Sequence, residues 1–322
     1  MTNERIGGDQ DRHKKSKLRS SDYHHIKMEK ENHSDPIVVE NLPEAEYTKC
    51  FTEYKKITNE YDAMMKLSKQ AFSEEWSGVK GKGRVLSIGP GTGDFDFALF
   101  EMLGWKPAFY AAVEPNQVFA QELKGRCHEM YGDDSNNAES FRIVSDLFTT
   151  TTPDLSDEIK HEKFDIILLV HCFYHLHPAS DIMKRCRDKL LAPGGKAMIY
   201  IQTEGIVTQL CGKFHPRWIF AKSLTGTEDY LVTDESLLAE FGGEVANGMQ
   251  YETLRAPSEV FMKDIWNDDQ KVHSIFSFIL QTNVEKLPES ELKNIHGHVQ
   301  TLLRDDMSLA HDSALVIAKR VD

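Results

Sequence analysis

The sequence predicts an α/β fold with a mostly parallel sheet that helices cover on both faces. Apolar runs of strand length alternate with helical stretches through the middle of the chain, a spacing typical of repeated strand–helix–strand units. These runs are mostly apolar, as expected for parallel strands buried on both faces. We expect strands at residues 84–88, 109–113, 141–144, 164–170 and 196–201, and helices at 93–103, 117–130 and 181–191.

Helical periodicity precedes and follows this central region. Apolar residues from Tyr47 to Leu67 recur at three- and four-residue steps, which predicts one helix, or two helices broken near Thr58 and Asn59. Later in the chain, amphipathic segments are expected at 234–241, 259–266, 271–280 and 289–303, and a last strand at 313–318. We expect the segments after Gln202 to cover the end of the sheet as inserts.

Composition and charge exclude several classes of protein. A formal charge of −13 disfavours nucleic acid and anionic membranes as partners and favours a neutral or cationic ligand. The five cysteines contain no CxxC pair, so neither a disulfide framework nor a zinc site is predicted, and a reducing cytoplasm fits best. No apolar stretch approaches the ~18 residues of a membrane span, and no signal segment is apparent. We expect a cytoplasmic monomer without a metal.

A glycine loop joins the first predicted strand to the next helix. It contains Gly89, Gly91 and Gly93, and glycines let a backbone approach a ligand closely. Glu114 follows Gly93 by 21 residues, at the end of the second predicted strand, where a carboxylate can accept hydrogen bonds from both ribose hydroxyls. Together they indicate an adenosine-containing cofactor, and both NAD and S-adenosylmethionine satisfy this pattern.

Two further segments favour S-adenosylmethionine. The loop is GxGxG and not the GxGxxG of dinucleotide binders. The Pro-Gly-Gly turn at residues 193–195 resembles the entry to the fifth strand of class I S-adenosylmethionine-dependent methyltransferases, and residues 164–175 resemble their fourth strand and following loop. This resemblance implies a Rossmann-like, seven-stranded, mostly parallel sheet. An NAD enzyme and a fold that has lost its cofactor remain the alternatives.

From about Tyr47 to the final strand, the chain also resembles the histamine N-methyltransferase family. The matching motifs are Ser87-Ile88-Gly89 with a downstream Gly-Asp-Phe-Asp, Val113-Glu114-Pro115, Lys163-Phe164-Asp165, Tyr230-Leu-Val-Thr233-Asp and the terminal apolar strand. In that family a Glu, a Gln and an Asn hold the amine and imidazole of the substrate. The match retains the Glu as Glu60, whereas His171 and Asp312 stand where the family has Gln and Asn.

These three residues, Glu60, His171 and Asp312, are the predicted catalytic residues. A carboxylate only accepts hydrogen bonds, whereas a histidine donates or accepts according to its tautomer, so the pocket would favour a cationic acceptor. The resemblance further implies an acceptor pocket lined by Phe51, Tyr174 and Phe278. Two tryptophans of the family fall near Val207 and Cys211, which offer less flat surface for stacking.

The resemblance assigns the cofactor contacts as well. The expected residues are Gly89, Gly91, Gly93 and Glu114, with Asp146 and Phe148 or Thr149 near the adenine and Val170 beneath the methyl donor. Methyl transfer from a sulfonium mainly requires alignment of a neutral lone pair and exclusion of water.

The predicted function is therefore S-adenosylmethionine-dependent N-methylation of a small, histamine-like amine or imidazole-containing compound. The alternatives are another small-molecule acceptor (an amino acid, a dipeptide or a polyamine), a protein or nucleic-acid acceptor, and a non-catalytic binding protein.

The domain organisation follows from these assignments. Residues 1–36 are predicted to be a disordered tail, because eight basic and seven acidic residues with few aliphatic ones cannot bury enough surface to offset the ordering entropy. Residues 37–322 form the methyltransferase domain. Within it we expect a substrate helix at about 44–76, a cofactor-binding core at about 82–202, and a substrate lid with the closing strand at about 203–322.

Overall fold

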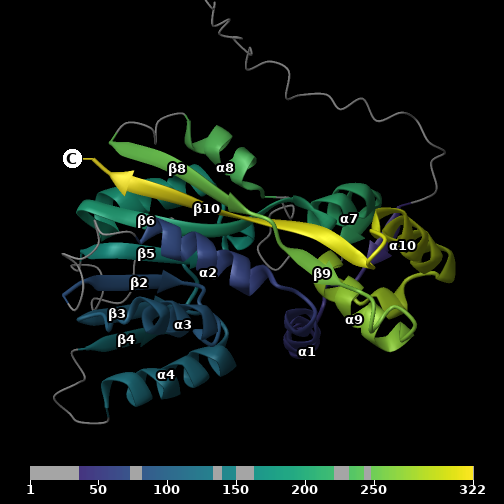
Figure 1. Ribbon diagram of the computed structural model, residues 1–322, viewed down its shortest axis with the longest axis horizontal. Coiled ribbons are helices and arrows are strands. Elements are labelled where there is room, and N and C mark those ends of the chain that lie inside the picture. Colours follow the sequence, from purple (N-terminus) through teal and green to yellow (C-terminus); the bar gives the residue numbers. More distant parts are fainter. Residues whose placement is uncertain are drawn as a thin grey trace, which may run out of the picture. The chain divides into compact units, whose positions relative to one another are not determined.

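Five parallel strands form one side of the sheet (Figure 1). They are β2 (Arg84–Ile88), β3 (Phe109–Val113), β4 (Phe141–Val144), β5 (Phe164–Val170) and β6 (Leu191–Gly205). β3 and β5 flank β2, β4 lies beyond β3 where the sheet ends, and β6 lies beyond β5. The first four have the predicted bounds, whereas β6 is longer than predicted. The computed structural model describes residues 36–72, 82–132, 140–149, 163–220, 232–242 and 248–321, so the predicted tail lies outside the described residues.

Antiparallel strands complete the sheet. β10 (Ser308–Arg320) pairs with β6, and β8 (Met249–Ala256) pairs with β10, which gives the order β4-β3-β2-β5-β6-β10-β8. The predicted seven-stranded, mostly parallel sheet is confirmed. The short strand β9 (Glu259–Phe261) pairs with the first residues of β10. No element is predicted from the sequence at β8. The amphipathic segment expected at 259–266 begins instead with β9, because pairing with β10 overrides the local pattern.

Helices cover both faces of this sheet. α3 (Asp94–Leu103) and α4 (Gln117–Tyr131) pack on one face together with α2 (Glu60–Ala71). α6 (Ala179–Arg185), its continuation as the π-helix η4 (Cys186–Leu190), and α8 (Asp234–Phe241) pack on the other. Within β2, Val85 belongs to the first core and its neighbour Leu86 to the second, so the strand is buried on both sides. This explains its mostly apolar sequence, in which Ser87 is also buried.

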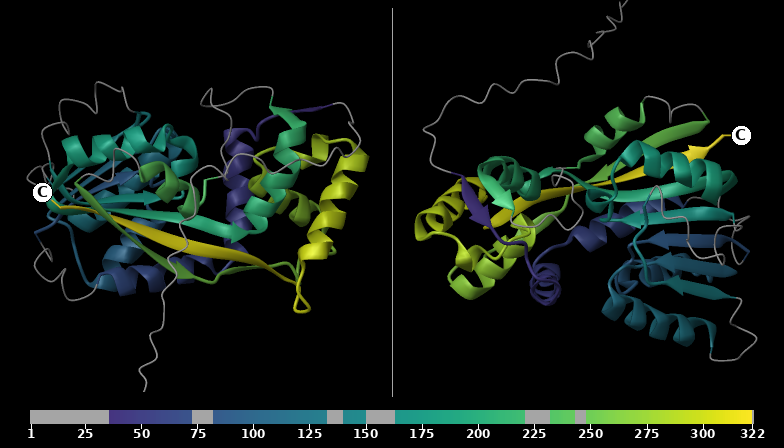
Figure 2. Two further views of the ribbon diagram at one scale, coloured as in Figure 1. Left: turned by 90° about the horizontal axis from the view of Figure 1, so that it is seen from above. Right: turned by 180° about the vertical axis from the view of Figure 1, so that it is seen from behind.

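A third core lies beside the sheet, at the end where β10 begins (Figure 2). It gathers side chains of α1 (Glu44–Lys56), α7 (Ile206–Phe214), α9 (Asp269–Leu280) and α10 (Glu289–Leu302). The short elements around it are β1 (Ile37–Val39), η5 (His215–Arg217), β7 (Trp218–Phe220) and η7 (Val284–Lys286), and β1 pairs in parallel with β7. In the described part of the chain, no helix combines the length and apolar character needed to cross a membrane.

The predicted break between two N-terminal helices is confirmed, since α1 ends at Lys56 and α2 begins at Glu60. The junction is fixed on β9: the backbone N–H of Glu259 donates to Oδ1 of Asn59 at 2.7 Å, and the Thr58 hydroxyl donates to the carbonyl of Glu259 at 3.0 Å. These bonds set the position of the first residue of α2, Glu60.

Candidate functional site

The loop after β2 has the conformation that its glycines predict. Gly89, Gly91 and Gly93 have φ values of 63°, 60° and 78°, in the left-handed region that favours glycine. A Cβ atom on Gly89 would lie 2.9 Å from Cβ of Cys172, and one on Gly93 would lie 2.5 Å from Cδ1 of Leu123. The loop therefore brings bare backbone to the carboxyl end of β2, where open α/β sheets bind ligands.

Glu114 lies beside this loop, directly after β3. Its side chain is buried and accepts hydrogen bonds from the backbone N–H groups of Gly91, at 2.8 Å, and Asn116, at 2.9 Å. Asn116 in turn caps α4, because its Oδ1 accepts from the N–H groups of Val118 and Phe119. The carboxylate is thus fixed at the edge of the sheet, as predicted from its spacing.

The other predicted cofactor residues lie at the ends of β4 and β5. Asp146 is exposed, and its carboxylate accepts from the N–H of Leu147 at 2.7 Å. Phe148 is buried and faces the guanidinium of Arg185, which also donates to the carbonyl of Thr149. Val170 is the last residue of β5, the neighbour of β2.

At the same end of the sheet, a carboxylate meets two imidazoles. Nε2 of His311 lies 2.7 Å from Oε1 of Glu60, and Nε2 of His171 lies 3.0 Å from the same oxygen. Nδ1 of His171 lies 2.9 Å from the hydroxyl of Tyr174, which belongs to the turn η3 (Phe173–His175). We call these four residues the Glu60 cluster. They come from α2, β10, the end of β5 and η3.

Backbone geometry brings the cluster next to the glycine loop. His171 leaves β5 with a φ of 48°, a strained conformation for a residue other than glycine, while its N–H still donates to the carbonyl of Tyr200. The following residue, Cys172, packs against Gly89. Because β5 is the neighbour of β2, His171 lies at the edge that also carries the loop.

His311 depends on a close approach of β6 and β10. It pairs with Gly205, where a Cβ atom would lie 2.8 Å from the carbonyl oxygen of Ala310 and 3.0 Å from Cα of His311. The His311 side chain is only 3% exposed, and Tyr54 packs against it edge-on at 6.0 Å.

The charges of the cluster stabilise one another. Burial would raise the pKa of Glu60, but the charges and hydrogen bonds of His311 and His171 outweigh it and hold the pKa well below its usual range. Burial would lower the pKa of His171, but the carboxylate of Glu60 raises it overall. Burial and then the charge of Glu60 raise the pKa of Tyr54. An ionised Glu60 beside histidine can bind or move protons near neutral pH.

Aromatic side chains form a wall next to the cluster. The rings of Phe51 and Phe278 are 5.3 Å apart, and Tyr54 lies 4.7 Å from Phe278. Tyr47 joins them at 5.6 Å from Phe278, and burial together with the charge of Glu114 raises the pKa of Tyr47 to about 12. Phe51 and Phe278 are brought together as predicted. Tyr174 instead stacks on His171, with 6.2 Å between centroids and an interplanar angle of 17°.

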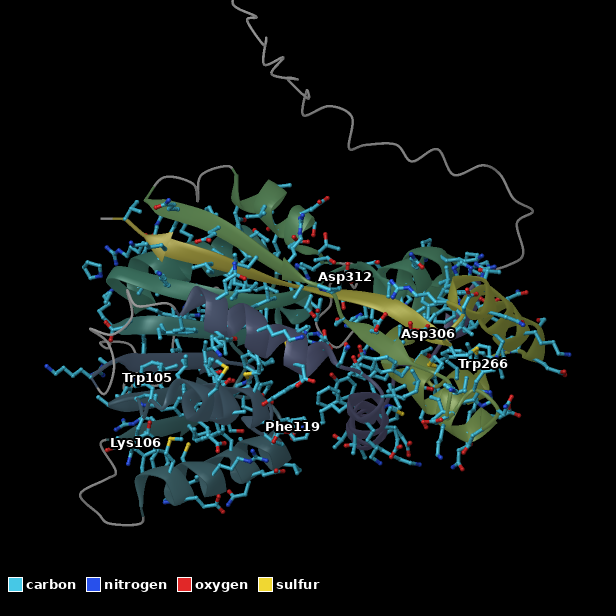
Figure 3. The ribbon with its side chains drawn as sticks, viewed as in Figure 1. Trp105, Lys106, Phe119, Trp266, Asp306 and Asp312 are labelled. Atoms are coloured by element: carbon cyan, nitrogen blue, oxygen red, sulfur yellow. The ribbon has the colours of Figure 1, made fainter. Side chains whose placement is uncertain are left out.

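The sequence predicts Asp312 beside Glu60, but the structure brings His311 there. The pairing of β10 with β6 shifts between His311 and Ser313, and the backbone carbonyl of Asp312 accepts from the Thr203 hydroxyl at 3.3 Å. Figure 3 labels Asp312 on β10. A one-residue irregularity exchanges the faces to which successive side chains of a strand point, and sequence spacing does not reveal it. His311 is therefore the residue that the sequence reasoning missed, and the only signal for it is its position next to Asp312.

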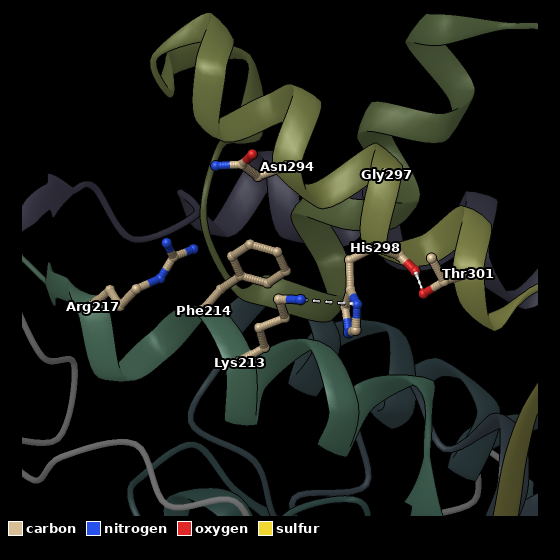
Figure 4. A pocket seen from close by; sticks show the side chains of 7 residues that line it. All are labelled: Lys213, Phe214, Arg217, Asn294, Gly297, His298 and Thr301. Carbon is tan, nitrogen blue, oxygen red and sulfur yellow. Dashed lines mark hydrogen bonds between the residues drawn. The ribbon is translucent and has the colours of Figure 1, made fainter. Parts of the chain in front are cut away.

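A separate cavity of about 430 Å³ lies between α7, η5 and α10 (Figure 4). It is lined by Lys213, Phe214, Arg217, Asn294, Gly297, His298 and Thr301. None of these is a predicted cofactor or acceptor residue, so this cavity is distinct from the site described above. Among the described residues, no group of three or more His, Cys, Asp or Glu has an arrangement that could hold a metal ion.

Comparison with known sequence families decides the class of protein. The family described as "Methyltransferase domain" matches residues 59–221, which is more than half of the chain. The chain belongs to this methyltransferase family. The matched region begins at the α1–α2 junction and contains Glu60, the glycine loop, Glu114 and His171. No match is found among the curated proteins.

A solved structure shares the fold of this methyltransferase. The YcgJ protein from Bacillus subtilis aligns with a TM-score of 0.50 and 14% identity, over 80% of this chain and 97% of that one. A putative sarcosine dimethylglycine methyltransferase from Galdieria sulphuraria aligns with a TM-score of 0.45 and 11% identity, over 80% and 86% of the two chains. At such identities the likeness concerns the fold alone.

The residues of the methyltransferase fit its cofactor, S-adenosylmethionine. The three glycines leave the loop open to a ligand, and a side chain at Gly89 or Gly93 would collide with Cys172 or Leu123. The Glu114 carboxylate, fixed at the same edge, offers the acceptor oxygens that ribose hydroxyls require. These features support the cofactor that the family implies.

Proposed function

We infer that this methyltransferase transfers a methyl group to the nitrogen of a small amine or imidazole-containing compound. The observation that carries this proposal is the Glu60 cluster: an ionised carboxylate with two histidines, one of which directly precedes the residue packed on the glycine loop. A buried carboxylate beside a partly exposed histidine suits a basic acceptor, because both groups can pair with N–H donors or protons.

The cofactor supplies a methyl group that is already activated on a sulfonium, so the protein has to hold and align the two reactants. In this proposal Gly89, Gly91, Gly93 and Glu114 hold the cofactor. Asp146, with Phe148 or Thr149, lies near the adenine, and Val170 lies beneath the methyl donor.

Three groups of residues would recognise the acceptor. Glu60 and His171 orient it, while Phe51, Phe278 and Tyr174 provide flat apolar surface for a ring or an alkylammonium. His311, which takes the place predicted for Asp312, holds the Glu60 carboxylate that favours the cationic end of the acceptor. Because His171 and Asp312 stand where the histamine N-methyltransferase family has Gln and Asn, histamine is one candidate among related amines.

The test is transfer of labelled methyl from S-adenosylmethionine to a panel of histamine, histidine, carnosine, small polyamines and a protein extract. Turnover of a small basic compound supports the proposal. Methylation of the protein extract alone contradicts the proposal. So does the absence of methylation of every panel member when calorimetry shows that the protein binds the cofactor.

A matched variant links the activity to the site. Glu60→Gln is expected to lower kcat/KM for the small acceptor by about 100-fold, with the affinity for the cofactor nearly unchanged. Glu46→Gln, at an exposed position of α1, serves as the control.

A further inference from the structure

We propose that Tyr174, His171 and Glu60 form a proton relay that removes the proton from the acceptor nitrogen, and that His311 is the positioning residue that holds Glu60. This inference rests on the proposed function, because it concerns the same acceptor. It assigns separate tasks to two histidines that bind one carboxylate.

The order of the relay follows from one ion pair and one hydrogen bond. Nε2 of His171 lies 3.0 Å from a Glu60 oxygen that can only accept, an ion-pair contact outside hydrogen-bond geometry, so we place a proton on this nitrogen. In a neutral imidazole the other nitrogen then accepts, and Nδ1 lies 2.9 Å from the Tyr174 hydroxyl. The hydroxyl therefore donates to His171. Its oxygen retains lone pairs with which it can accept a proton from a ligand.

Exposure gives the relay a direction. The Glu60 side chain is 11% exposed and that of His311 is 3% exposed, whereas the His171 side chain is 27% exposed and Tyr174 is partly exposed. A ligand therefore meets the Tyr174–His171 end of the chain first. Oε1 of Glu60 already faces two imidazole Nε2 atoms, so this oxygen acts on the acceptor through His171.

The groups around His171 come from four elements. Glu60 faces it from α2 and Tyr174 from η3, and beyond Glu60 lie His311 of β10 and Tyr54 of α1. Glu60 is the charge that acts on His171, and it stabilises the imidazolium. This is the arrangement that a histidine requires if it is to receive a proton and keep it.

The proton balance is simple. An acceptor ammonium gives one proton to the oxygen of Tyr174 as Tyr174 gives its own to Nδ1 of His171, so His171 becomes an imidazolium paired with Glu60. Tyr174 stays a phenol throughout, which is necessary because burial and the charge of Glu60 raise its pKa well above the usual value. The freed nitrogen lone pair forms the new N–C bond while the C–S bond breaks and its electron pair stays on sulfur.

One test does not depend on turnover. Full-length protein with ¹⁵N-labelled histidine, saturated with S-adenosylhomocysteine, is titrated by NMR. In the wild type we expect neutral His171 to carry its proton on Nε2. Tyr174→Phe should change the ¹⁵N chemical shift of Nδ1 of His171, and Glu60→Gln should lower the apparent pKa of His171 by roughly one unit. Tyr61→Phe, whose phenol donates to the carbonyl of Asp94, is the matched control. His171 in the Nδ1–H form, or unmoved by both variants, overturns the relay.

The second test uses the acceptor that the panel identifies. Tyr174→Phe and His171→Gln are expected to lower kcat by about 100-fold at pH 7. The loss should shrink as pH rises towards 10, because a growing fraction of an alkylamine is then already unprotonated and needs no proton removed. A loss that is equal at every pH indicates a merely structural role and overturns the proposal. If the panel is silent, the proposed function fails, and the NMR titration alone decides the relay.

Discussion

His311 on the last strand places its Nε2 atom 2.7 Å from Oε1 of Glu60, a residue 251 positions earlier in the chain. The contact joins β10 to the first turn of α2, and both side chains are buried. A buried carboxylate is costly unless it is paired and hydrogen-bonded. The pair of Glu60 and His311 is therefore a tertiary contact that helps to fix α2 on the sheet. Glu60 has this role in addition to its proposed part in acceptor binding.

This contact predicts a coupling energy between the two residues. His311→Leu should lower the free energy of unfolding by about 2–3 kcal/mol at pH 7, because it leaves a buried charge with one partner fewer. Glu60→Gln alone removes the charge. The double variant should therefore lose less than the sum of the single losses, by about 1 kcal/mol or more. Urea denaturation of the four proteins measures this cycle, and additive losses would contradict the contact.

Glu114 predicts a change in cofactor affinity. Glu114→Ala removes both carboxylate oxygens from the edge of β3, and a lost hydrogen bond to a charged group costs about 1.5–3 kcal/mol. The Kd for S-adenosylmethionine, measured by calorimetry, should therefore rise about 10- to 100-fold. Glu101→Ala on the exposed face of α3 is the control and should leave the Kd unchanged. An unchanged Kd in Glu114→Ala would remove Glu114 from the cofactor site.

Alanine substitutions at two glycines, Gly93 and Gly125, are expected to have opposite effects on stability. Gly93→Ala forces an alanine to a φ of 78° and into a contact of 2.5 Å with Leu123, so it should lower the free energy of unfolding by at least about 1 kcal/mol. Gly125 lies within α4 and has open space around it, so Gly125→Ala should raise that free energy by about 0.5–1 kcal/mol. Thermal unfolding without cofactor compares them. Stabilisation by Gly93→Ala would show that the loop is not constrained.

Local patterns in the sequence are sufficient for the parallel half of the sheet. Strands buried on both faces, such as β3 and β5, are mostly apolar runs, and their bounds are predicted correctly. β8 is different, because its burial pattern alternates and its residues from Met249 on pair only with β10, near the end of the chain. Such long-range pairing has no local signal.

The candidate site shows the same division. The glycine loop and Glu114 follow two consecutive strands, and Glu114 is 21 residues after Gly93, so both could be predicted from spacing. Phe51 and Phe278 were predicted from a resemblance, and their rings do meet. The exchange of Asp312 for His311 depends on one irregular step in the pairing of β10 with β6, which arises only when the strands meet.

A buried aspartate predicts how stability depends on pH. Asp96 in α3 is 1% exposed, accepts a hydrogen bond from the Tyr110 hydroxyl at 2.8 Å, and has its pKa raised to about 6, chiefly by burial. The folded protein therefore binds this proton more tightly than the unfolded chain does. As pH rises from about 4 to 6 the unfolded chain ionises first, so Asp96 lowers the free energy of unfolding by an amount on the order of 3 kcal/mol.

Asp96→Asn keeps the oxygen that faces Tyr110 and removes the charge. The free energy of unfolding of Asp96→Asn minus that of the wild type should therefore rise across this pH range and level off above pH 7. Urea denaturation at pH 4.5 to 8 tests this, and a difference that stays constant or falls with pH would show that the Asp96 pKa is not raised.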